Sequence, residues 1–427
     1  MSSVAGCGSR RMEPSYPVAL FDNHQTMRQF DVRPTVPLEG RLLSTRLYPL
    51  AAGNFAIGTG MFVTAGLLPP ISTDLDVSPA AAGQLMTVFA LTYAVLSPPL
   101  AAVTARMPRR TLLLTGMGVF VLGNALTALA PTYPLVMATR VLAAAGAAMF
   151  TPTASAVASA LSAPERRGRA LALVIGGMSL ASAIGVPLGT WLGDAASWRA
   201  TLWLVTGLGV AGFAGVAALV PDVTIPISGR LKDRFVPLGD RRVLAVLGTH
   251  VLMFAASFAA YTYLGSLFDL PPAAVLWAWG LGAVVGNQLG GRFTDVYGPR
   301  RMIMIALVAG TVFLALIPVA NLALPVALVW AFLWSALGWL LAPAQQFRTV
   351  AAVPDNVSVG LGLLSSAQYL GLFVAGLAGG AALGGWGRTG VIVLSTGLGL
   401  AALLFTLVTY RPEAAPAISS RESAPVR

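Results

Sequence analysis

Two ionisable side chains interrupt long apolar runs of this sequence, and both could act on a charge or a proton. Arg140 lies several residues inside one such run. If the run crosses a membrane, a charge at that depth is costly and normally faces the protein interior with a partner. We expect Arg140 to contact a substrate or to control proton movement through its charge. The alternative is that its long side chain extends to the outer surface, where the guanidinium stays in water.

His250 lies about eight residues, or roughly 12 Å, into another apolar run. Its unperturbed pKa of about 6.5 suits a proton switch at physiological pH, so we expect it to carry or sense the transported proton. The alternative is a neutral histidine bonded to a neighbouring carbonyl. Asp194 and Asp269 are weaker candidates because both are expected at helix ends, in water.

The remaining polar side chains of the apolar runs are amides and phenols. They are Asn54, Gln84, Tyr93, Asn124, Tyr261, Tyr263, Asn287, Gln288, Gln345, Gln346, Gln368 and Tyr369. Scattered groups of this kind in an apolar cavity suit a neutral or amphipathic ligand with no carboxylate or phosphate. We expect Asn54, Tyr93, Tyr261, Gln288 and Gln368 to lie on the substrate and proton pathway, although many of the twelve could simply bond between helices.

The composition requires that these residues be positioned by helices in a membrane. Of the 427 residues, 56% are hydrophobic and only 10% are charged, and the mean hydropathy is +0.77. A soluble domain carries about 25% charged residues, so most of this surface is expected to face lipid. The only cysteine, Cys7, lies near the amino terminus, so no intrachain disulfide can form.

Twelve apolar stretches follow one another, and each has about the length that crosses a bilayer as a helix. Their approximate ranges are 47–68, 80–103, 111–130, 134–161, 170–193, 200–220, 243–268, 273–291, 301–320, 323–344, 358–383 and 389–409. The longer charged link at 222–242 predicts two six-helix halves, 46–221 and 243–410. Residues 1–45 and 411–427 are predicted to be cytoplasmic tails, the first of them disordered and without a signal peptide.

The net charge of +11 is explained by topology. If the first helix runs outward, the inward links carry fifteen basic residues, whereas the outward links carry Arg199 and Arg388. The inward residues are Arg106, Arg109, Arg110, Arg166, Arg167, Arg169, Arg230, Lys232, Arg234, Arg241, Arg242, Arg292, Arg300, Arg301 and Arg348. The positive-inside rule therefore predicts that both termini lie in the cytoplasm, and nucleic acid is not an expected partner.

One short link carries a motif that is typical of a known family. The link after the eighth stretch contains Gly291, Asp295, Gly298, Arg300 and Arg301 in the pattern G-x-x-x-D-x-x-G-x-R-R. A weaker echo, AAVTARMPRR, follows the second stretch and has Ala105 and Pro108 in place of the acid and the glycine. The first pattern resembles the loop signature of the major facilitator superfamily. We interpret its glycine as allowing close helix approach and its aspartate as lying at the amino end of the next helix.

Further segments resemble the drug:proton antiporter branch of that family, which contains bacterial chloramphenicol-resistance and arabinose-type efflux permeases. They are GTGMFVTAGLLPPISTDLDVSPAAAGQL in the first stretch, RVLAAAG from residue 140, GVPLGT from residue 185 and WRATLW from residue 198. The resemblance covers the chain from residue 47 onward and implies export of a small molecule in exchange for protons. Where the branch usually has a membrane-embedded glutamate, this chain has Met61. We expect Met61 to lie on the substrate and proton pathway, although a methionine there removes an obvious proton carrier.

Small residues recur every four positions in three of the stretches. They are Gly177, Ala181, Gly185, Gly189 and Gly193 in the fifth, Ala278, Gly282, Gly286 and Gly290 in the eighth, and Ala367, Gly371, Ala375 and Gly379 in the eleventh. Such stripes let helix backbones approach closely in lipid. We expect Gly185, Pro187, Gly189, Gly282, Gly286 and Gly371 to form the seam along which the halves rock, as the resemblance also implies. The alternative is ordinary static packing.

Other classes of membrane protein fit less well. The sole lysine cannot supply the G-x-x-x-x-G-K-[ST] motif of an ATP-driven pump, and no aspartate cluster is present for an intramembrane transferase. We predict a monomeric, all-α transporter in a bacterial cell membrane, in contact with lipid, with no catalytic residues, metal or cofactor. Its expected activity is proton-coupled export of a small, largely neutral or amphipathic drug-like compound. A sugar or endogenous metabolite as substrate, or transport without proton coupling, remains open.

Overall fold

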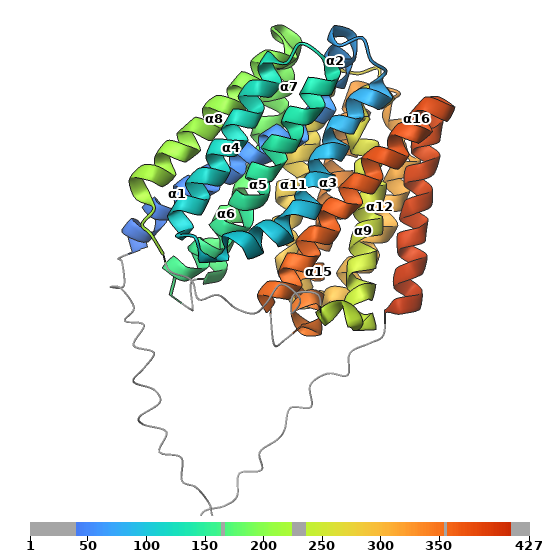
Figure 1. Ribbon diagram of the computed structural model, residues 1–427. Coiled ribbons are helices and arrows are strands. Elements are labelled where there is room, and N and C mark those ends of the chain that lie inside the picture. Colours follow the sequence, from blue (N-terminus) through green and yellow to red (C-terminus); the bar gives the residue numbers. More distant parts are fainter. Residues whose placement is uncertain (1–39, 164–166, 224–235, 354–356, 411–427) are drawn as a thin grey trace, which may run out of the picture. The chain divides into compact units, whose positions relative to one another are not determined.

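A computed structural model describes residues 40–163, 167–223, 236–353 and 357–410, and every element in these ranges is a helix (Figure 1). Eight of the described helices are long and apolar enough to cross a membrane, or nine when the bent pair near residue 67 is counted as one span. The last of the eight, α16 (Val357–Thr409), consists of two helices that meet at Gly387. With these two counted separately, and with α11 and α12 added, the described chain has the twelve predicted segments.

The amino-terminal half contains the first six segments. They are α1 (Gly40–Phe62) with η2 (Val63–Gly66) and α2 (Leu68–Asp74), α3 (Pro79–Val103), α4 (Arg109–Leu129), α5 (Tyr133–Leu161), the group α6 (Arg167–Leu180), η5 (Ala181–Gly185) and α7 (Val186–Ala195), and α8 (Trp198–Leu219). A short η3 (Thr104–Arg106) follows α3. Helix α1 begins at residue 40, inside the predicted tail 1–45, whereas residues 1–39 lie outside the described part.

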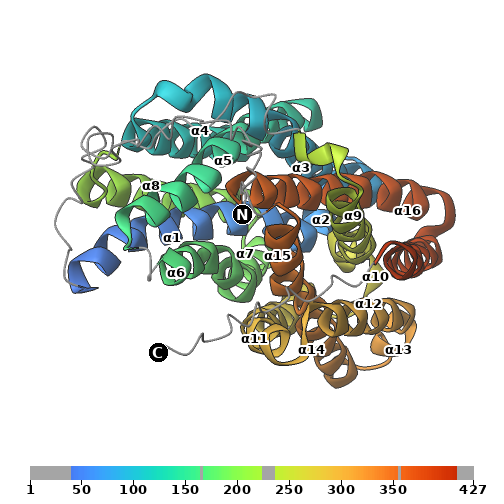
Figure 2. The same cartoon turned by 90° about the horizontal axis from the view of Figure 1, so that it is seen from below.

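The carboxy-terminal half repeats this plan. Its elements are η7 (Val236–Gly239), α9 (Arg241–Thr262) with α10 (Leu264–Leu267), α11 (Pro272–Tyr297), α12 (Pro299–Ala315) with α13 (Ile317–Ala320), α14 (Leu324–Trp339) with α15 (Leu341–Ala352), and α16. Figure 2 looks along these helices and places α11, α12, α13 and α14 beside one another. The predicted tail at 411–427 lies outside the described residues.

Prolines account for two of the breaks inside spans. A proline in a helix cannot donate to the carbonyl four residues earlier, and its ring clashes with that carbonyl. Pro187 follows the single π turn of η5, which relieves this clash. Pro343 follows the break at Leu340 that separates α14 from α15. Both breaks thus lie next to a proline, although each apolar stretch had been predicted as one continuous helix.

Matching ion pairs close one end of each half. In the first half, Arg199 pairs with Asp74, and the indole nitrogen of Trp198 donates to the same carboxylate at 3.1 Å. In the second half, both terminal nitrogens of Arg388 donate to Asp269 at 2.6 Å. The guanidinium of Arg388 holds the pKa of Asp269 below its usual value. These pairs join corresponding links of the two halves, so they add a second internal echo to the one in the basic loops.

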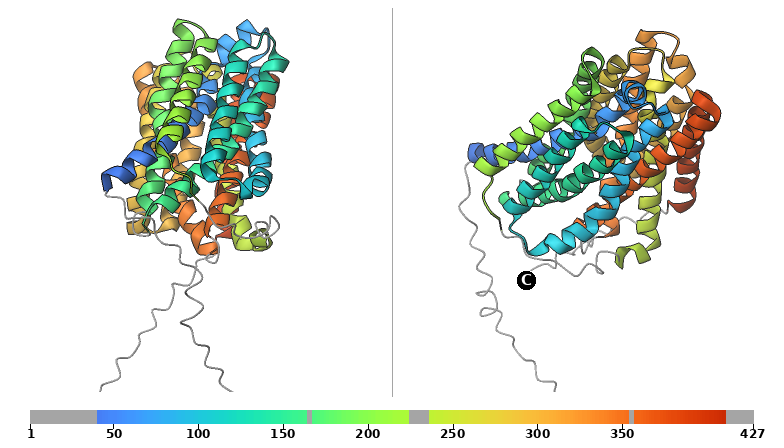
Figure 3. Two further views of the ribbon diagram at one scale, coloured as in Figure 1. Left: turned by 60° about the vertical axis from the view of Figure 1, so that its left-hand side comes forward. Right: turned by 45° about the horizontal axis from the view of Figure 1, so that its top comes forward.

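The two halves meet through the fifth and eighth spans and through the second and eleventh spans. Helix α11 packs against η5 and α7, and α3 packs against α16. Figure 3 shows these helices from two further sides. The halves also meet where η2 contacts α9, α10 and α11.

The glycine stripe of the fifth span nevertheless faces its own half. A Cβ added at Gly185 would strike Thr59 of α1, and one added at Gly189 would lie 2.7 Å from Val63 of η2. Pro187 is buried in the first turn of α7. The prediction that this stripe lies between the halves is therefore wrong for Gly185 and Gly189. Their small size allows close packing against the first span.

The glycines of the eighth and eleventh spans that were predicted to lie at the seam also face their own half. An added Cβ would meet the Phe332 carbonyl of α14 at Gly282 and the Ala336 carbonyl of the same helix at Gly286. At Gly371 it would lie 2.7 Å from the Cβ of Phe254 in α9. All three glycines thus pack inside the carboxy-terminal half, in agreement with the static-packing alternative.

Neighbouring small residues make the contact between the halves instead. A Cβ on Gly280 would lie 2.6 Å from the Cα of Ala183 and would strike the carbonyl of Ser182, both in η5. A Cβ on Gly376 of α16 would strike the Thr87 hydroxyl of α3. The seam therefore uses faces adjacent to the predicted stripes, because those stripes are already occupied by helices of the same half.

The signature link also differs from its interpretation. Helix α11 continues to Tyr297, so the exposed Asp295 lies in its last turn and not at the amino end of α12. Gly298 has a φ of 82°, a left-handed conformation that favours glycine. A Cβ on Gly291 would meet nothing within 4 Å, so this glycine does not serve close packing in the conformation described. Arg300 lies over the ring of Tyr410, whereas Arg301 is exposed.

Candidate functional site

Arg140 is directed into the protein by α5 and is only 2% exposed, so it does not extend to the surface. One terminal nitrogen, Nη2, donates to the Gly60 carbonyl of α1 at 3.1 Å, and the guanidinium lies 4.8 Å from the centre of the Phe89 ring of α3. Its Nε and Nη1 have no hydrogen-bond partner among the described residues. The guanidinium of Arg140 therefore has a carbonyl and an aromatic face as partners, and its Nε and Nη1 atoms remain available as donors.

Met61 follows Gly60 directly and is 1% exposed. The position where related permeases are expected to carry a glutamate is thus next to the peptide that binds Arg140. A thioether cannot neutralise the guanidinium or exchange a proton with it. The charge of Arg140 consequently stays unbalanced at this point of the fold.

His250 is 2% exposed in α9, and its ring centre lies 4.6 Å from that of Phe254, one turn further along the helix. Its Nδ1 has no hydrogen-bond partner among the described residues. This atom therefore does not make the carbonyl bond of the alternative interpretation. Arg140 and His250 belong to different halves, and no described contact joins them.

Three predicted pathway residues have structural or peripheral positions. Asn54 is completely buried and donates to the Val174 carbonyl at 2.9 Å, which ties α1 to α6. Gln288 is exposed and Gln368 is half-buried. The structure does not bring these three side chains together.

The two predicted tyrosines both lie where the halves meet. Tyr93 of α3 stacks on Tyr369 of α16, with the ring centres 3.6 Å apart. The hydroxyl of Tyr261 donates to the Phe62 carbonyl of α1 at 3.4 Å. Each tyrosine therefore contacts the opposite half.

A further group of hydrogen bonds joins the two halves. Gln84 of α3 donates to the Gly376 carbonyl at 3.1 Å and to the hydroxyl of Tyr263 at 3.3 Å. Tyr263 in turn donates to the Gly376 carbonyl at 2.8 Å. These residues, with Tyr261 and Phe62, lie at the ends of their helices that are remote from the basic links at 106–110 and 292–301. The halves are thus bonded to each other at one end of the bundle.

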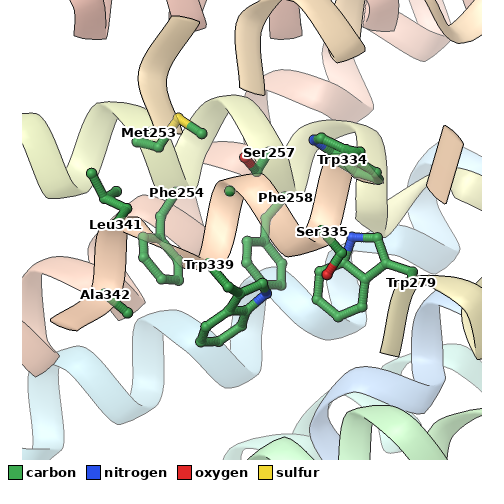
Figure 4. Close-up of a pocket in the computed structure, with 11 residues that line it drawn as sticks. Met253, Phe254, Ser257, Phe258, Trp279, Trp334, Ser335, Trp339, Leu341 and Ala342 are labelled. Atoms are coloured by element: carbon green, nitrogen blue, oxygen red, sulfur yellow. The ribbon is translucent and has the colours of Figure 1, made fainter. Parts of the chain in front are cut away.

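An aromatic cavity lies in the carboxy-terminal half and was missed by the sequence analysis. It contains about 420 Å³ of empty space between α9, α11, α14 and α15. Five aromatic rings dominate its wall, and Figure 4 shows them with their neighbours. The lining residues are Met253, Phe254, Ser257, Phe258, Trp279, Trp334, Ser335, Gly338, Trp339, Leu341 and Ala342.

Part of the signal for this cavity was present in the sequence. Phe254 and Phe258 are four residues apart and therefore share one face of a helix. Only polar side chains had been expected to contact a ligand, so the tryptophans were missed. Pro343 also marks the break beside Trp339 that shapes one end of the cavity.

Comparison with known proteins agrees with this architecture. The Major Facilitator Superfamily profile matches residues 50–276. The chain belongs to the major facilitator superfamily. The inner membrane transport protein YdhP of Escherichia coli K12 is 33% identical over 369 residues, which is 83% of this chain and 90% of that protein. A chloramphenicol resistance protein of Streptomyces lividans is also 33% identical, over 83% of this chain and 89% of its own length.

A solved structure supports the fold alone. The nucleoside transporter NupG has a TM-score of 0.70 and covers 86% of this chain and all of its own, at 12% identity. Membership of this superfamily makes the chain a multi-pass membrane transporter, and the resemblance to chloramphenicol-resistance permeases is confirmed.

Proposed function

We propose that this major facilitator exports a small, largely neutral or amphipathic drug-like compound, and is a transporter without enzymatic activity. It works by alternating access in a bacterial cell membrane, with both termini in the cytoplasm and a proton as the coupling ion. The basic links at 106–110 and 292–301 support this orientation through the positive-inside rule.

The observation that carries the proposal is the set of hydrogen bonds that join the two halves at one end of the bundle. In the proposed orientation, the contacts of Gln84, Tyr261 and Tyr263 lie on the outer side of the membrane. A bundle closed outside is one of the two states of an alternating-access transporter, and it is the state in which an exporter takes up its substrate from the cytoplasm. Transport then requires these few bonds to break and the basic-link ends to approach.

The choice of substrate class follows from the cavity and from one relative. The cavity wall carries no ionisable side chain, which suits a compound of low charge. The chloramphenicol resistance protein, 33% identical over most of the chain, supports an aromatic antibiotic as a candidate. A sugar or an endogenous metabolite would be distinguished by the same export measurements.

Transport without proton coupling is a second candidate that Met61 favours. The described partners of Arg140 are the Gly60 carbonyl and the Phe89 ring, neither of which can exchange a proton, and His250 is the proposed carrier.

The decisive experiment is expression in a bacterium that lacks its own efflux pumps. We expect raised resistance to one or more neutral aromatic compounds in a panel that includes chloramphenicol, and loss of that resistance when a protonophore is added. Resistance that survives the protonophore would contradict a proton as the coupling ion. No change in resistance or accumulation for any compound would contradict export of drug-like molecules.

Replacing His250 with asparagine is expected to remove the part of the pH dependence of export that protonation of this side chain causes. The reason is that asparagine keeps a polar group at this buried position but cannot take up a proton. Export should be measured in everted vesicles at several fixed pH values. The matched control is His24→Asn, which removes the only other histidine of the chain. An unchanged pH profile in His250→Asn would dismiss His250 as the proton carrier.

A further inference from the structure

We infer that the aromatic cavity of the carboxy-terminal half binds the flat ring system of an uncharged compound, which Ser335 orients through one hydrogen bond. This assignment rests on the proposed export function and names the chemical class and the site for it. Three features of the cavity support it: the arrangement of the rings, one unpaired hydroxyl and a lining without ionisable residues.

The rings of the cavity stand mostly at steep angles to one another. Trp279 is the central ring, and its plane makes angles of 80°, 63° and 75° with those of Phe258, Trp334 and Trp339, at centre distances of 6.2 to 6.3 Å. Phe254 and Trp339 make an angle of 81° at 6.4 Å. Aromatic pairs favour edge-to-face and offset-stacked contacts at about 4.5–7 Å. A flat guest ring could therefore meet faces and edges in the same space.

Ser335 supplies the polar contact. Its side chain is 2% exposed, lines the cavity, and its Oγ has no hydrogen-bond partner among the described residues. Figure 4 shows this oxygen beside Trp279. A buried hydroxyl without a partner is unfavourable. A guest with a single donor or acceptor at the edge of its ring would remove this cost while the ring fills the apolar space.

The lining residues indicate that the bound compound is uncharged. None of the eleven lining residues is ionisable, so a carboxylate or phosphate would be buried without a counter-charge. An acyl chain of a lipid would fill apolar space but would leave the Ser335 hydroxyl unpaired. A cation could lie on aromatic faces, and the test below treats it as a competing outcome.

The site belongs to one half of the transporter. Its lining comes from α9, α11, α14 and α15, all in the carboxy-terminal half. One lining ring, Phe258, also lies 5.8 Å from Phe62 of α1, and Phe62 is the residue whose carbonyl accepts the bond from Tyr261. Because a single half supplies the wall, the guest can stay bound while the halves rock.

Four small probes test the assignment on the purified full-length chain. They are indole, its carbon analogue indene, the cation ethidium and the anion salicylate. We expect indole to bind in equilibrium dialysis, and Trp279→Leu to weaken its binding by about tenfold or more, as loss of a central aromatic contact does. The control Trp277→Leu changes a tryptophan two residues away on α11 that is 46% exposed, and should leave binding unchanged.

Ser335→Ala tests the hydrogen bond with little risk to the fold. It should weaken indole, which has an N–H group, about three- to tenfold and leave indene unaffected, since a net hydrogen bond is worth about that much. Equal loss for both probes would overturn the role of Ser335. Binding of ethidium or salicylate without indole, or equal effects of Trp279→Leu and Trp277→Leu, would overturn the site.

Export measurements separate this inference from the proposed function. If Trp279→Leu loses indole binding while wild-type cells export none of the tested compounds, the site stands and the export function fails. If Trp279→Leu exports neutral aromatic compounds as well as wild type, the site fails and the function stands.

Discussion

Replacement of Arg140 by methionine is expected to lower export at least tenfold without harming the fold. The guanidinium is buried with a carbonyl, an aromatic face and two unpaired N–H donors. Burying a charge without a counter-charge costs several kcal/mol, and an apolar side chain of similar volume is often neutral or stabilising. We therefore expect Arg140→Met to unfold at the same temperature as wild type or higher.

The conservative variant separates charge from shape. Arg140→Lys keeps a positive charge that can lie over Phe89 and donate to the Gly60 carbonyl, so it should retain a measurable part of the export rate. Export from cells and thermal unfolding of the purified protein are the two measurements. Normal export by Arg140→Met would show that the charge has no part in transport.

Gly280→Ala is expected to abolish export while each half stays folded. Its new Cβ would strike the Ser182 carbonyl and lie 2.6 Å from the Cα of Ala183, both in η5 of the opposite half. Backbone atoms cannot rotate away as a side chain can, so α11 and η5 must separate. This contact between the halves would be lost, and with it the conformation described here.

Gly282→Ala, two residues further along α11, is the matched control. Its Cβ would strike the Phe332 carbonyl of α14 inside the same half, so it should lower the unfolding temperature and the yield of folded protein. Export per cell, the amount of protein in the membrane and the unfolding temperature should be measured for both variants. Equal loss of stability in the two would contradict a specific role of Gly280 between the halves.

Most of the fold could be predicted because hydropathy and proline depend on local sequence. The predicted first residue lies within three residues of the observed one in α3, α4, α5, α8, α9, α11 and α14. The end of α11 was missed by six residues, because polar residues in a helix that extends beyond the membrane look like a link. The turn that ends this helix is made by Gly298, whose positive φ the motif did not reveal.

The candidate site was predicted much less completely. Burial of Arg140 and the position of Tyr93 and Tyr261 near the opposite half are compatible with the prediction of a central pathway, but their roles remain predictions. Asn54 ties neighbouring helices, and Gln288 is exposed. A polar residue in an apolar stretch signals a partner, and the sequence does not say whether that partner is a ligand or the next helix.

The sequence by itself determined the twelve spans and the concentration of basic residues in alternate links. These properties follow from the preference of each segment for lipid or water and from the geometry of its own backbone. Only the tertiary structure decided which helix meets each glycine stripe, and that Gly280 rather than Gly282 or Gly286 faces the other half. Helical periodicity groups residues on a face but does not name the neighbour of that face. The tertiary structure also decided the aromatic cavity. Its rings Phe258, Trp279 and Trp334 are far apart in sequence and meet only when α9, α11 and α14 pack together.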